Sequence, residues 1–458
     1  MNDIIFEPMH VIGPRLRRRE TTSEELTRAA LDQVDRWGAR INPFVTLTAE
    51  IALEMARERD AELSDGIDRG PLHGIPVVLK DLFLTRGTRS TGGSKVFENR
   101  VPDQDATVVR LLRDAGAVFI GKTGMPEFAT EPTSTNVTFG AVHNPWNLTL
   151  DTSGSSSGTG AAVATGMAWC GPGSDTGGSI RMPAAACGLV GLKPTYGRVS
   201  LRGVMPLAVS RDHIGPMART VRDAALLMNA LAWYDQDDPY SRDAPIDDYA
   251  ADLDGGVHGR RIAAFTDDGG DPVPTDILDG FQAGLRTLEV SGAEVDRVDL
   301  ADLLSSLRTG DIFTAEMYSH HGHLLRDHAA ELSEEVRKTL EEGQRVSGAQ
   351  VIEQIRARDA ILHQVERRLR DYDLIVNPTL GVQLPPAGEM CAPLLRFTSV
   401  WDHIGWPAIS VPVGLSSESG MPIGFQIIGR PWTESRLLQA ARVVEREHAL
   451  SFPPTGVR

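Results

Sequence analysis

The feature that most constrains this chain is a run of nine residues drawn only from Gly, Ser and Thr, at residues 152–160. Small apolar residues follow at 161–167, and the polar run Ser-Asp-Thr-Gly-Gly-Ser-Ile-Arg closes the stretch at 174–181. A flexible linker has a similar composition but separates domains, whereas this run continues into residues that can pack in a core. Dense glycines allow close approach to a ligand, and clustered N–H groups and hydroxyls can bind an oxyanion and pass protons. The stretch therefore predicts an active site.

Length, charge and cysteine content limit the function classes. The length of 458 residues would allow two or three domains, but no tract separates the halves, so one large domain with an insertion is at least as good an interpretation. A formal net charge of −16 argues against binding nucleic acid or an anionic membrane. The three cysteines, Cys170, Cys187 and Cys391, indicate a reducing cytoplasm rather than a disulfide framework. Neither a signal peptide nor a run of about 18 apolar residues is visible, so we expect a cytoplasmic protein.

Helix and strand patterns alternate along the first 120 residues. Thr22-Ser-Glu-Glu25 has the form of a capping box, which predicts a helix from there to about Trp37. Further predicted elements are a helix at 49–63, a strand at 75–79, a helix at 106–115 and a strand at 117–120. This alternation is typical of an α/β fold whose sheet is covered on both faces.

Two familiar motifs match by chance or weakly. Residues 116–123 fit the P-loop pattern, but the positions that should form its loop are themselves the predicted strand at 117–120, so we reject it. Residues 154–158 fit the G-x-S-x-G nucleophile elbow, which would make Ser156 the nucleophile. The preceding residues 147–151 make a poor strand, and the later histidines have no distinctive context, so the elbow remains the weaker alternative.

Several motifs in order resemble the amidase signature family. They are residues 74–81 (Gly-Ile-Pro-Val-Val-Leu-Lys-Asp), the Gly/Ser run and residues 174–181, with supporting matches at 121–123, 138–140, 144–146, 188–195, 212–216, 405–412 and 424–429. The resemblance covers nearly the whole chain outside about 255–395. It implies one α/β domain over residues 1–458, with a central twisted mixed β-sheet covered by helices on both faces. Residues 255–395 would be a variable, mostly helical insertion that contributes to the substrate pocket.

The resemblance also implies a Ser–Ser–Lys triad. Its positions correspond to Lys80, the nucleophile Ser179 and a bridging serine that follows a cis peptide bond. A gapless match makes this peptide Gly154–Ser155, and a one-residue gap would select Ser156 instead. The register needs care because Thr152, Ser153 and Ser157 depart from the family's usual residues.

An oxyanion hole beside Ser179 is implied by the same match. Its donors would be the backbone N–H groups of Thr176, Gly177, Gly178 and Ser179, since glycines let the chain curl around the developing charge. We expect the charged residues beside this loop, Asp175 and Arg181, to form a supporting ion pair.

Lys80 can serve as the base only if it is neutral. Burial among Val77, Val78 and Leu79, without a carboxylate contact, would lower its pKa. A shift of about 3 units costs roughly 4 kcal/mol, which a large core can offset. Lys80 would then take a proton from Ser179 through Ser155. Because base, relay and oxyanion donors are all in the chain, we expect no metal and no cofactor; the spacing of the histidines at 320–328 scatters them over several helix faces.

Aromatic and apolar residues suggest the substrate. We expect pocket walls from Met125, Phe128, Ala129, Thr130, Trp401 and Trp406, with no basic cluster to select an anion. The first hypothesis is therefore a free-standing amidase, monomeric or homodimeric, that hydrolyses the C–N bond of small, fairly apolar carboxamides through an acyl-enzyme on Ser179. Its substrates would be aryl amides or anilides, carbamates (urethanes) or esters. The alternative is the glutamine-hydrolysing component of a tRNA-dependent amidotransferase complex.

Overall fold

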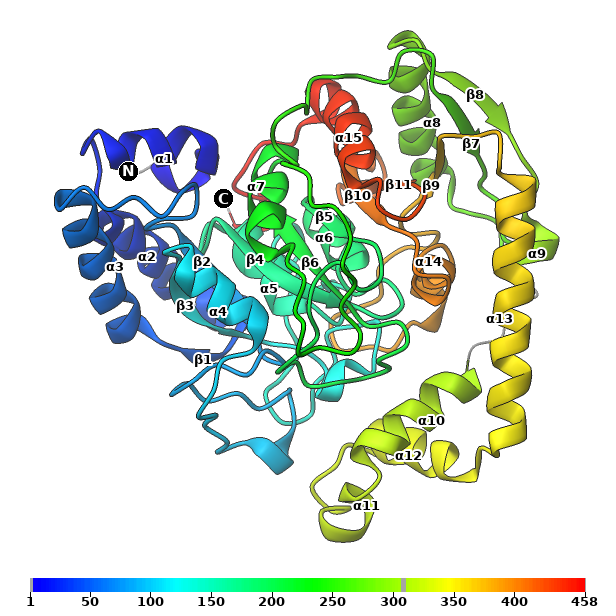
Figure 1. Ribbon diagram of the computed structural model, residues 1–458, viewed down its shortest axis with the longest axis horizontal. Coiled ribbons are helices and arrows are strands. Elements are labelled where there is room, and N and C mark those ends of the chain that lie inside the picture. The colour runs from blue at the N-terminus through cyan, green and yellow to red at the C-terminus, as the bar shows by residue number, and fades with distance from the viewer. Residues whose placement is uncertain (1–2, 306–309, 458) are drawn as a thin grey trace.

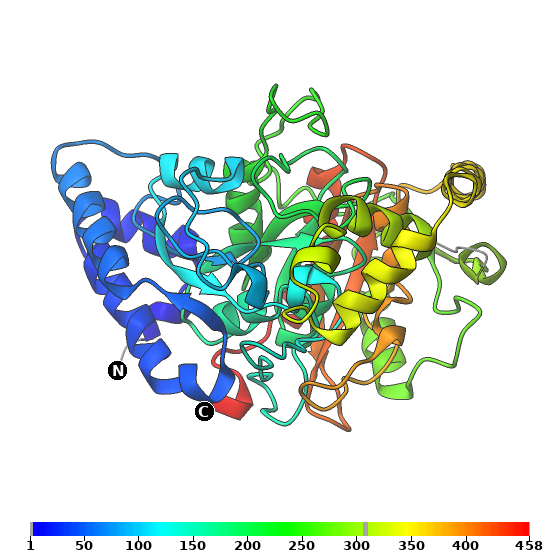
Figure 2. The same ribbon diagram turned by 90° about the horizontal axis from the view of Figure 1, so that it is seen from below.

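A mixed β-sheet runs through the centre of the computed structural model, which describes residues 3–305 and 310–457. Within these residues the sheet has 11 strands in the order β1-β3-β2-β4-β6-β5-β10-β11-β9-β7-β8. Helices cover both faces, and the sheet crosses the molecule from the N-terminal helices to the edge strands β7 and β8 (Figures 1 and 2). The predicted single-domain α/β fold class is thus confirmed.

The strands have the following bounds. They are β1 Phe44–Leu47, β2 Pro76–Lys80, β3 Val118–Thr123, β4 Cys170–Asp175, β5 Val190–Lys193, β6 His213–Ala218, β7 Arg261–Ala264, β8 Glu294–Arg297, β9 Leu374–Pro378, β10 Ala408–Leu415 and β11 Pro422–Ile428. Strand β2 pairs in parallel with β3 and β4, whereas β4 pairs antiparallel with β6.

The α-helices are given in chain order. They are α1 Met9–Arg17, α2 Ser23–Ile41, α3 Ala49–Ser64, α4 Thr107–Asp114, α5 Ser157–Ala164, α6 Arg181–Cys187, α7 Val221–Leu231, α8 Thr275–Val290, α9 Ala301–Ser305, α10 Gly310–His321, α11 Leu324–Asp327, α12 Glu334–Arg345, α13 Gly348–Arg368, α14 Ser399–His403 and α15 Glu434–His448. None of the helices described is long and apolar enough to cross a membrane.

The early elements form where the sequence predicts them. The Thr22 side chain accepts the Glu25 N–H at 3.1 Å, and the Glu25 carboxylate accepts the Thr22 N–H at 3.0 Å, so the capping box is confirmed at the start of α2. Helices α3 and α4 and strands β2 and β3 each begin within about two residues of the predicted start. Because β3 occupies the P-loop match, no phosphate-binding loop can form there.

Helix α5 is buried on all sides, which its small residues permit. It is built of Gly, Ala, Ser, Thr and one Val, and it packs against β2, β4 and α6. A Cβ at Gly158 would lie 2.4 Å from the Pro43 carbonyl oxygen and 2.5 Å from the Gly124 nitrogen, so only glycine fits. The Gly/Ser run is therefore the point at which a helix enters the core.

Residues 255–395 differ from their prediction in one respect. The expected helices are present, and α10, α11 and α12 extend away from the sheet beside the long α13 (Figure 1). Strand β9 returns the chain to the sheet after these helices, and β7 and β8, which were not predicted, pair in parallel at the sheet edge. Three of the four β8 side chains are exposed, so that strand lacks an apolar pattern. The insertion's bounds stay a prediction, and its residues 306–309 lie outside the described chain.

Candidate active site

Lys80 ends strand β2 with its side chain fully buried. Its Nζ lies 2.7 Å from Ser155 Oγ and 2.8 Å from Ser174 Oγ, and it donates to both. Burial holds the pKa of Lys80 well below its usual value, although Asp175 and Asp212 act in the opposite direction. The lowered pKa favours the neutral amine, which is the form that can accept a proton.

The three consecutive serines of the Gly/Ser run have different partners. The Gly154–Ser155 peptide bond is cis, as expected, and Ser155 is the serine that contacts Lys80. Ser156 Oγ donates instead to the Ser174 carbonyl at 3.2 Å, and Ser157 Oγ donates to the Ser153 carbonyl at 2.8 Å. The contacts thus agree with the gapless register.

Ser179 lies in the turn between β4 and α6. Its carbonyl accepts the Ser156 N–H at 3.2 Å, which ties it to the residue next to Ser155. Ser179 also lines a cavity of about 220 Å³. The structure therefore brings Lys80, Ser155 and Ser179 to one place, although they come from three separate segments.

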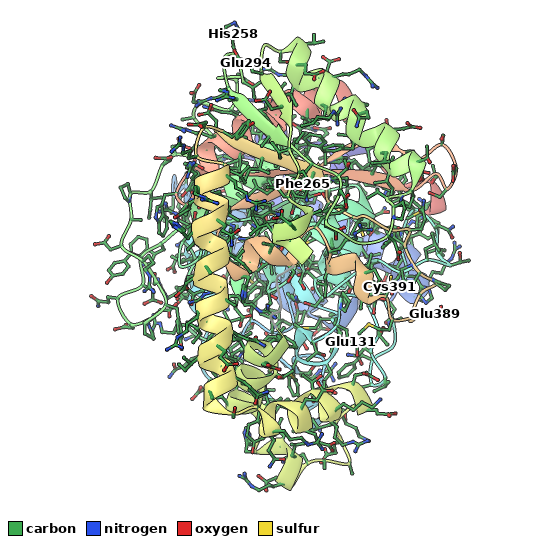
Figure 3. The ribbon with its side chains drawn as sticks, turned by 90° about the vertical axis from the view of Figure 1, so that its right-hand side faces the viewer. Glu131, His258, Phe265, Glu294, Glu389 and Cys391 are labelled. Atoms are coloured by element: carbon green, nitrogen blue, oxygen red, sulfur yellow. The ribbon has the colours of Figure 1, made fainter. Side chains whose placement is uncertain are left out.

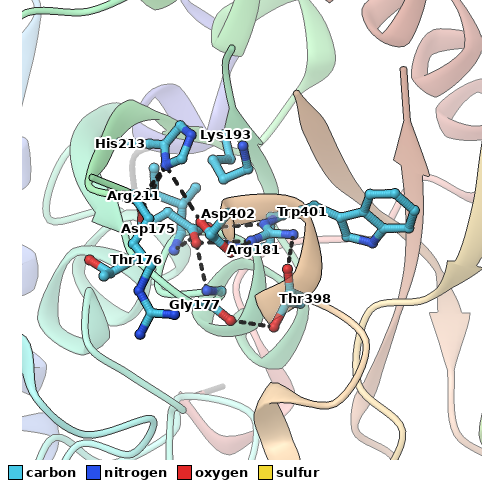
Figure 4. Close-up of polar contacts among 12 residues, drawn as sticks. Asp175, Thr176, Gly177, Arg181, Lys193, Arg211, His213, Thr398, Trp401 and Asp402 are labelled. Carbon is cyan, nitrogen blue, oxygen red and sulfur yellow. Dashed lines mark hydrogen bonds and ion pairs between the residues drawn. The ribbon is translucent and has the colours of Figure 1, made fainter. Parts of the chain in front are cut away.

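Asp175 organises the loop that precedes Ser179. Its carboxylate accepts the N–H groups of Gly178 at 2.5 Å, Ile180 at 3.0 Å and Arg181 at 3.3 Å. The Gly178 amide is therefore directed at Asp175, which leaves Thr176, Gly177 and Ser179 as the candidate oxyanion donors. On its other side the loop is held by Thr398, whose hydroxyl donates to the Gly177 carbonyl at 2.6 Å (Figure 4).

Arg181 connects this loop to the C-terminal part of the chain. The expected ion pair with Asp175 is present at 2.9 Å, and Asp402 forms a second one at 2.5 Å. All three side chains are fully buried (Figure 4). Burial raises the pKa of Asp402 well above its usual value. At Asp175 burial acts in the same direction, but Arg181 outweighs it and lowers the pKa. The two carboxyl groups that flank the guanidinium therefore differ in pKa, in opposite directions from the usual value.

The predicted pocket residues do not all reach the cavity. Ala129 and Thr130 line it, together with residues such as Leu207, Phe313 and Leu395. The others lie in the packed interior, for which their large apolar side chains suit them. Trp401 and Trp406 lie against each other with ring centroids 6.4 Å apart, Phe128 stacks on His321 at 4.5 Å, and Met125 is 2% exposed.

Sequence reasoning missed two charged residues of the cavity wall, Arg211 and Glu131. Arg211 directly precedes the 212–216 motif and places a single basic side chain in the cavity wall, where no basic cluster was expected from the sequence. Glu131 lies on the side of the molecule that also carries Glu389 and Cys391 (Figure 3). Burial and the nearby Glu335 raise the pKa of Glu131 to about 7. Ser174 was also missed as a Lys80 partner, although it begins the motif at 174–181.

Known proteins match this chain from end to end. The family model described as Amidase matches residues 25–438. A Geobacter metallireducens protein, named as one of the subunits of glutamyl-tRNA(Gln) amidotransferase, is 37% identical, covering 98% of this chain and 99% of its own. The crystal structure of the Thermotoga maritima protein of the same name is 31% identical, with a TM-score of 0.81 and 94% of each chain covered. A chain from an inhibitor-bound complex, described as vestigial and linked to the origins of an s-triazine catabolic enzyme, is 29% identical, with a TM-score of 0.91 and 97% and 100% coverage.

These relatives correct two expectations. The first hypothesis, a free-standing amidase for small, fairly apolar carboxamides, is wrong, because the full-length relatives are named as amidotransferase subunits. The same names contradict a monomer or homodimer that meets only a small-molecule substrate. The family itself is not in doubt: this chain belongs to the amidase signature family and is an enzyme that hydrolyses C–N bonds.

Proposed function

We propose that this chain is the glutamine-hydrolysing subunit of a tRNA-dependent amidotransferase and that it supplies ammonia to a protein partner. The observation that carries the proposal is the end-to-end match with amidotransferase subunits. The contact between buried Lys80 and Ser155, next to Ser179, supports the hydrolytic half of the reaction. An enzyme that serves tRNA in this way works in the cytoplasm.

The proposed reaction begins at Ser179. Its Oγ attacks the carboxamide carbon of glutamine while its proton passes to Ser155, whose own proton passes to Lys80. The tetrahedral oxyanion accepts hydrogen bonds from the N–H groups of Thr176, Gly177 and Ser179. The C–N bond then breaks, and the nitrogen takes up the proton held by Lys80 and leaves as ammonia.

A glutamyl ester of Ser179 remains after ammonia has left. Water attacks this ester and gives up a proton along the same path, which restores the Ser179 hydroxyl and releases glutamate. Lys80 thus acts as base in each attack and as acid in each departure. Its lowered pKa suits this alternation, because burial makes the amine a weaker base that gives the proton back more readily than a lysine in water.

The test is the release of ammonia from glutamine. We expect the purified chain to release ammonia from glutamine faster than aniline from acetanilide, and to do so faster still when bound to its partner subunits. Ser179→Ala serves as the inactive control for both substrates. A preference for acetanilide over glutamine, unchanged by partner subunits from a homologous complex, would overturn the proposal.

A further inference from the structure

Arg211 places a guanidinium group at the wall of the Ser179 cavity. The residue lies in the turn before β6, and its side chain runs alongside Thr176 and Gly177 (Figure 4). Only 7% of the residue is exposed. The same cavity is lined by Ser179, so a group bound by Arg211 would lie within the substrate space.

The guanidinium has donors without acceptors. Among the residues described, Nε and Nη1 of Arg211 have no hydrogen-bond partner. Three carboxylates act on the charge of Arg211, those of Asp402, Asp212 and Glu316, but none accepts a hydrogen bond from its Nε or Nη1. Asp402 accepts from Arg181 at 2.5 Å, Asp212 from the Thr176 hydroxyl at 2.6 Å and Glu316 from the Ser210 hydroxyl at 3.0 Å. Phe313 contacts the guanidinium through its ring, 5.1 Å from Cζ to the centroid, and offers no oxygen.

A buried guanidinium without hydrogen-bond acceptors destabilises the empty site, and a bound substrate can supply those acceptors. A carboxylate matches the planar fork of arginine with two charge-assisted hydrogen bonds, which a neutral amide oxygen cannot do as well. The contact therefore favours an anionic ligand over a neutral one of the same size.

The surroundings of Glu131 limit where that anion can lie. Glu131 lines the same cavity, and Glu335 and Glu127 add negative charge near it. A carboxylate would be repelled from this part of the wall. Arg211 is thus the anion-binding position in a cavity of about 220 Å³, which is small enough to exclude large polyanions.

We propose that Arg211 binds a carboxylate group of the substrate, at the end remote from the amide that Ser179 attacks, and so determines specificity for carboxylate-bearing amides. This inference rests on the proposed function in naming glutamine as such an amide. Arg211 contacts the bound substrate but takes no part in proton transfer. Its loss should therefore raise KM more than it lowers kcat.

Two amides that differ in the carboxylate test the proposal. Glutaramate carries it and pentanamide does not. We expect the wild-type enzyme to prefer glutaramate by at least about tenfold in kcat/KM, since charged hydrogen bonds contribute about 1.5–3 kcal/mol each. Arg211→Met should remove that preference, chiefly by raising KM for glutaramate, and should change kcat/KM for pentanamide much less. Arg211→Lys should restore part of it, and Arg202→Met, which changes a half-exposed arginine paired with Asp235, should have no effect.

A binding measurement covers the case of slow turnover. Glutarate should protect Ser179 from a sulfonyl fluoride in the wild-type enzyme, and Arg211→Met should raise the protecting concentration about tenfold. Equal losses on both amides, or no protection of the wild-type enzyme, would overturn the role of Arg211. If the wild-type enzyme hydrolyses glutamine but does not prefer glutaramate to pentanamide, only the role of Arg211 is rejected. If the wild-type enzyme prefers glutaramate but does not hydrolyse glutamine, only the proposed function is rejected.

Discussion

The Gly/Ser run with its neighbours and the helical arm α10–α13 differ in where their polar groups lie: the run buries them, and the arm exposes them. Residues 151–164 are all buried, and their hydroxyls bond to backbone carbonyls, to Lys80 or, at Thr159, to the hydroxyl of Thr123. In the arm, charges stand on the surface in pairs such as Arg337–Glu341 and Lys338–Glu334. The arm reaches the cavity only through a few residues, among them Phe313.

This contrast separates the residues that carry out the reaction from those that select the substrate. A buried polar group tolerates little change, because its partners would be left unsatisfied. An exposed pair contributes little and can be exchanged. We therefore expect substitutions of the buried residues that carry the proton or the ester to reduce turnover most, those on the cavity wall to change substrate preference, and those on the arm surface to leave both intact.

Ser179→Ala should have the largest effect and remove turnover altogether, because no other group then forms the ester. The fold should persist, since the Ser179 contact given by the structure is made by its backbone carbonyl. Ammonia release and a circular-dichroism melting curve measure the two effects. Mass spectrometry after sulfonyl fluoride treatment should find the adduct on Ser179; an adduct on Ser156 would instead support the nucleophile-elbow interpretation.

Replacing Lys80 should cost several orders of magnitude in kcat/KM. Lys80→Arg should be nearly as damaging as Lys80→Ala, because a guanidinium group stays protonated and cannot accept the proton. In the wild-type enzyme kcat/KM should rise with pH through the lowered pKa of Lys80, because the amine acts only when deprotonated. A pH–rate profile measures this. Substantial activity in Lys80→Arg would show that the base lies elsewhere.

Ser155→Ala should reduce activity strongly, but less than Lys80→Ala does, because the amine remains and only the proton path is broken. Ser156→Ala is the matched control from the same buried run. Its hydroxyl donates to the Ser174 carbonyl, so its removal should act modestly and through packing alone. Rates of both variants at saturating glutamine decide the register; a larger loss in Ser156→Ala would move the bridging role to Ser156.

Asp402→Asn should change how stability depends on pH more than it changes the rate. The folded protein holds the Asp402 proton more tightly than the unfolded chain does. The resulting stabilisation is complete below the unfolded pKa of about 3.9 and is lost as pH rises toward the folded pKa. Relative to Asp402→Asn, the wild-type unfolding free energy should fall with pH by up to about 1.4 kcal/mol per unit. Urea titrations between pH 4.5 and 8 measure the difference, and parallel curves would contradict it.

Lys338→Ala should have the smallest effect of all. The side chain pairs with Glu334 at 2.9 Å on the exposed surface of α12, where water screens the charges. Melting temperature and kcat/KM should both match the wild-type values. A clear loss of activity would mean that the surface of the arm takes part in the reaction.

Features carried by a contiguous motif could be predicted from the sequence, but contacts between segments far apart in the chain could not. Lys80, Ser155 and Ser179 belong to recognisable motifs, and the capping box predicted the start of α2. Arg211 and Asp402 have no local pattern, since their roles arise only when strands far apart in the chain pack together. Trp401 and Trp406 were misplaced because a large apolar ring suits a pocket and a core equally, and only packing decides between them.

The bracing of the oxyanion loop has a consequence for synthesis of the protein. Gly177 is held by Thr398, 221 residues later, and Arg181 by Gln426, 245 residues later. A nascent chain that has extruded residue 193 already contains Lys80, Ser155 and Ser179, yet lacks these braces. Contacts this distant form late and slow folding. The oxyanion loop therefore gains its braces only after β10 and β11 have been translated, and we expect nascent chains that end before these strands to be inactive.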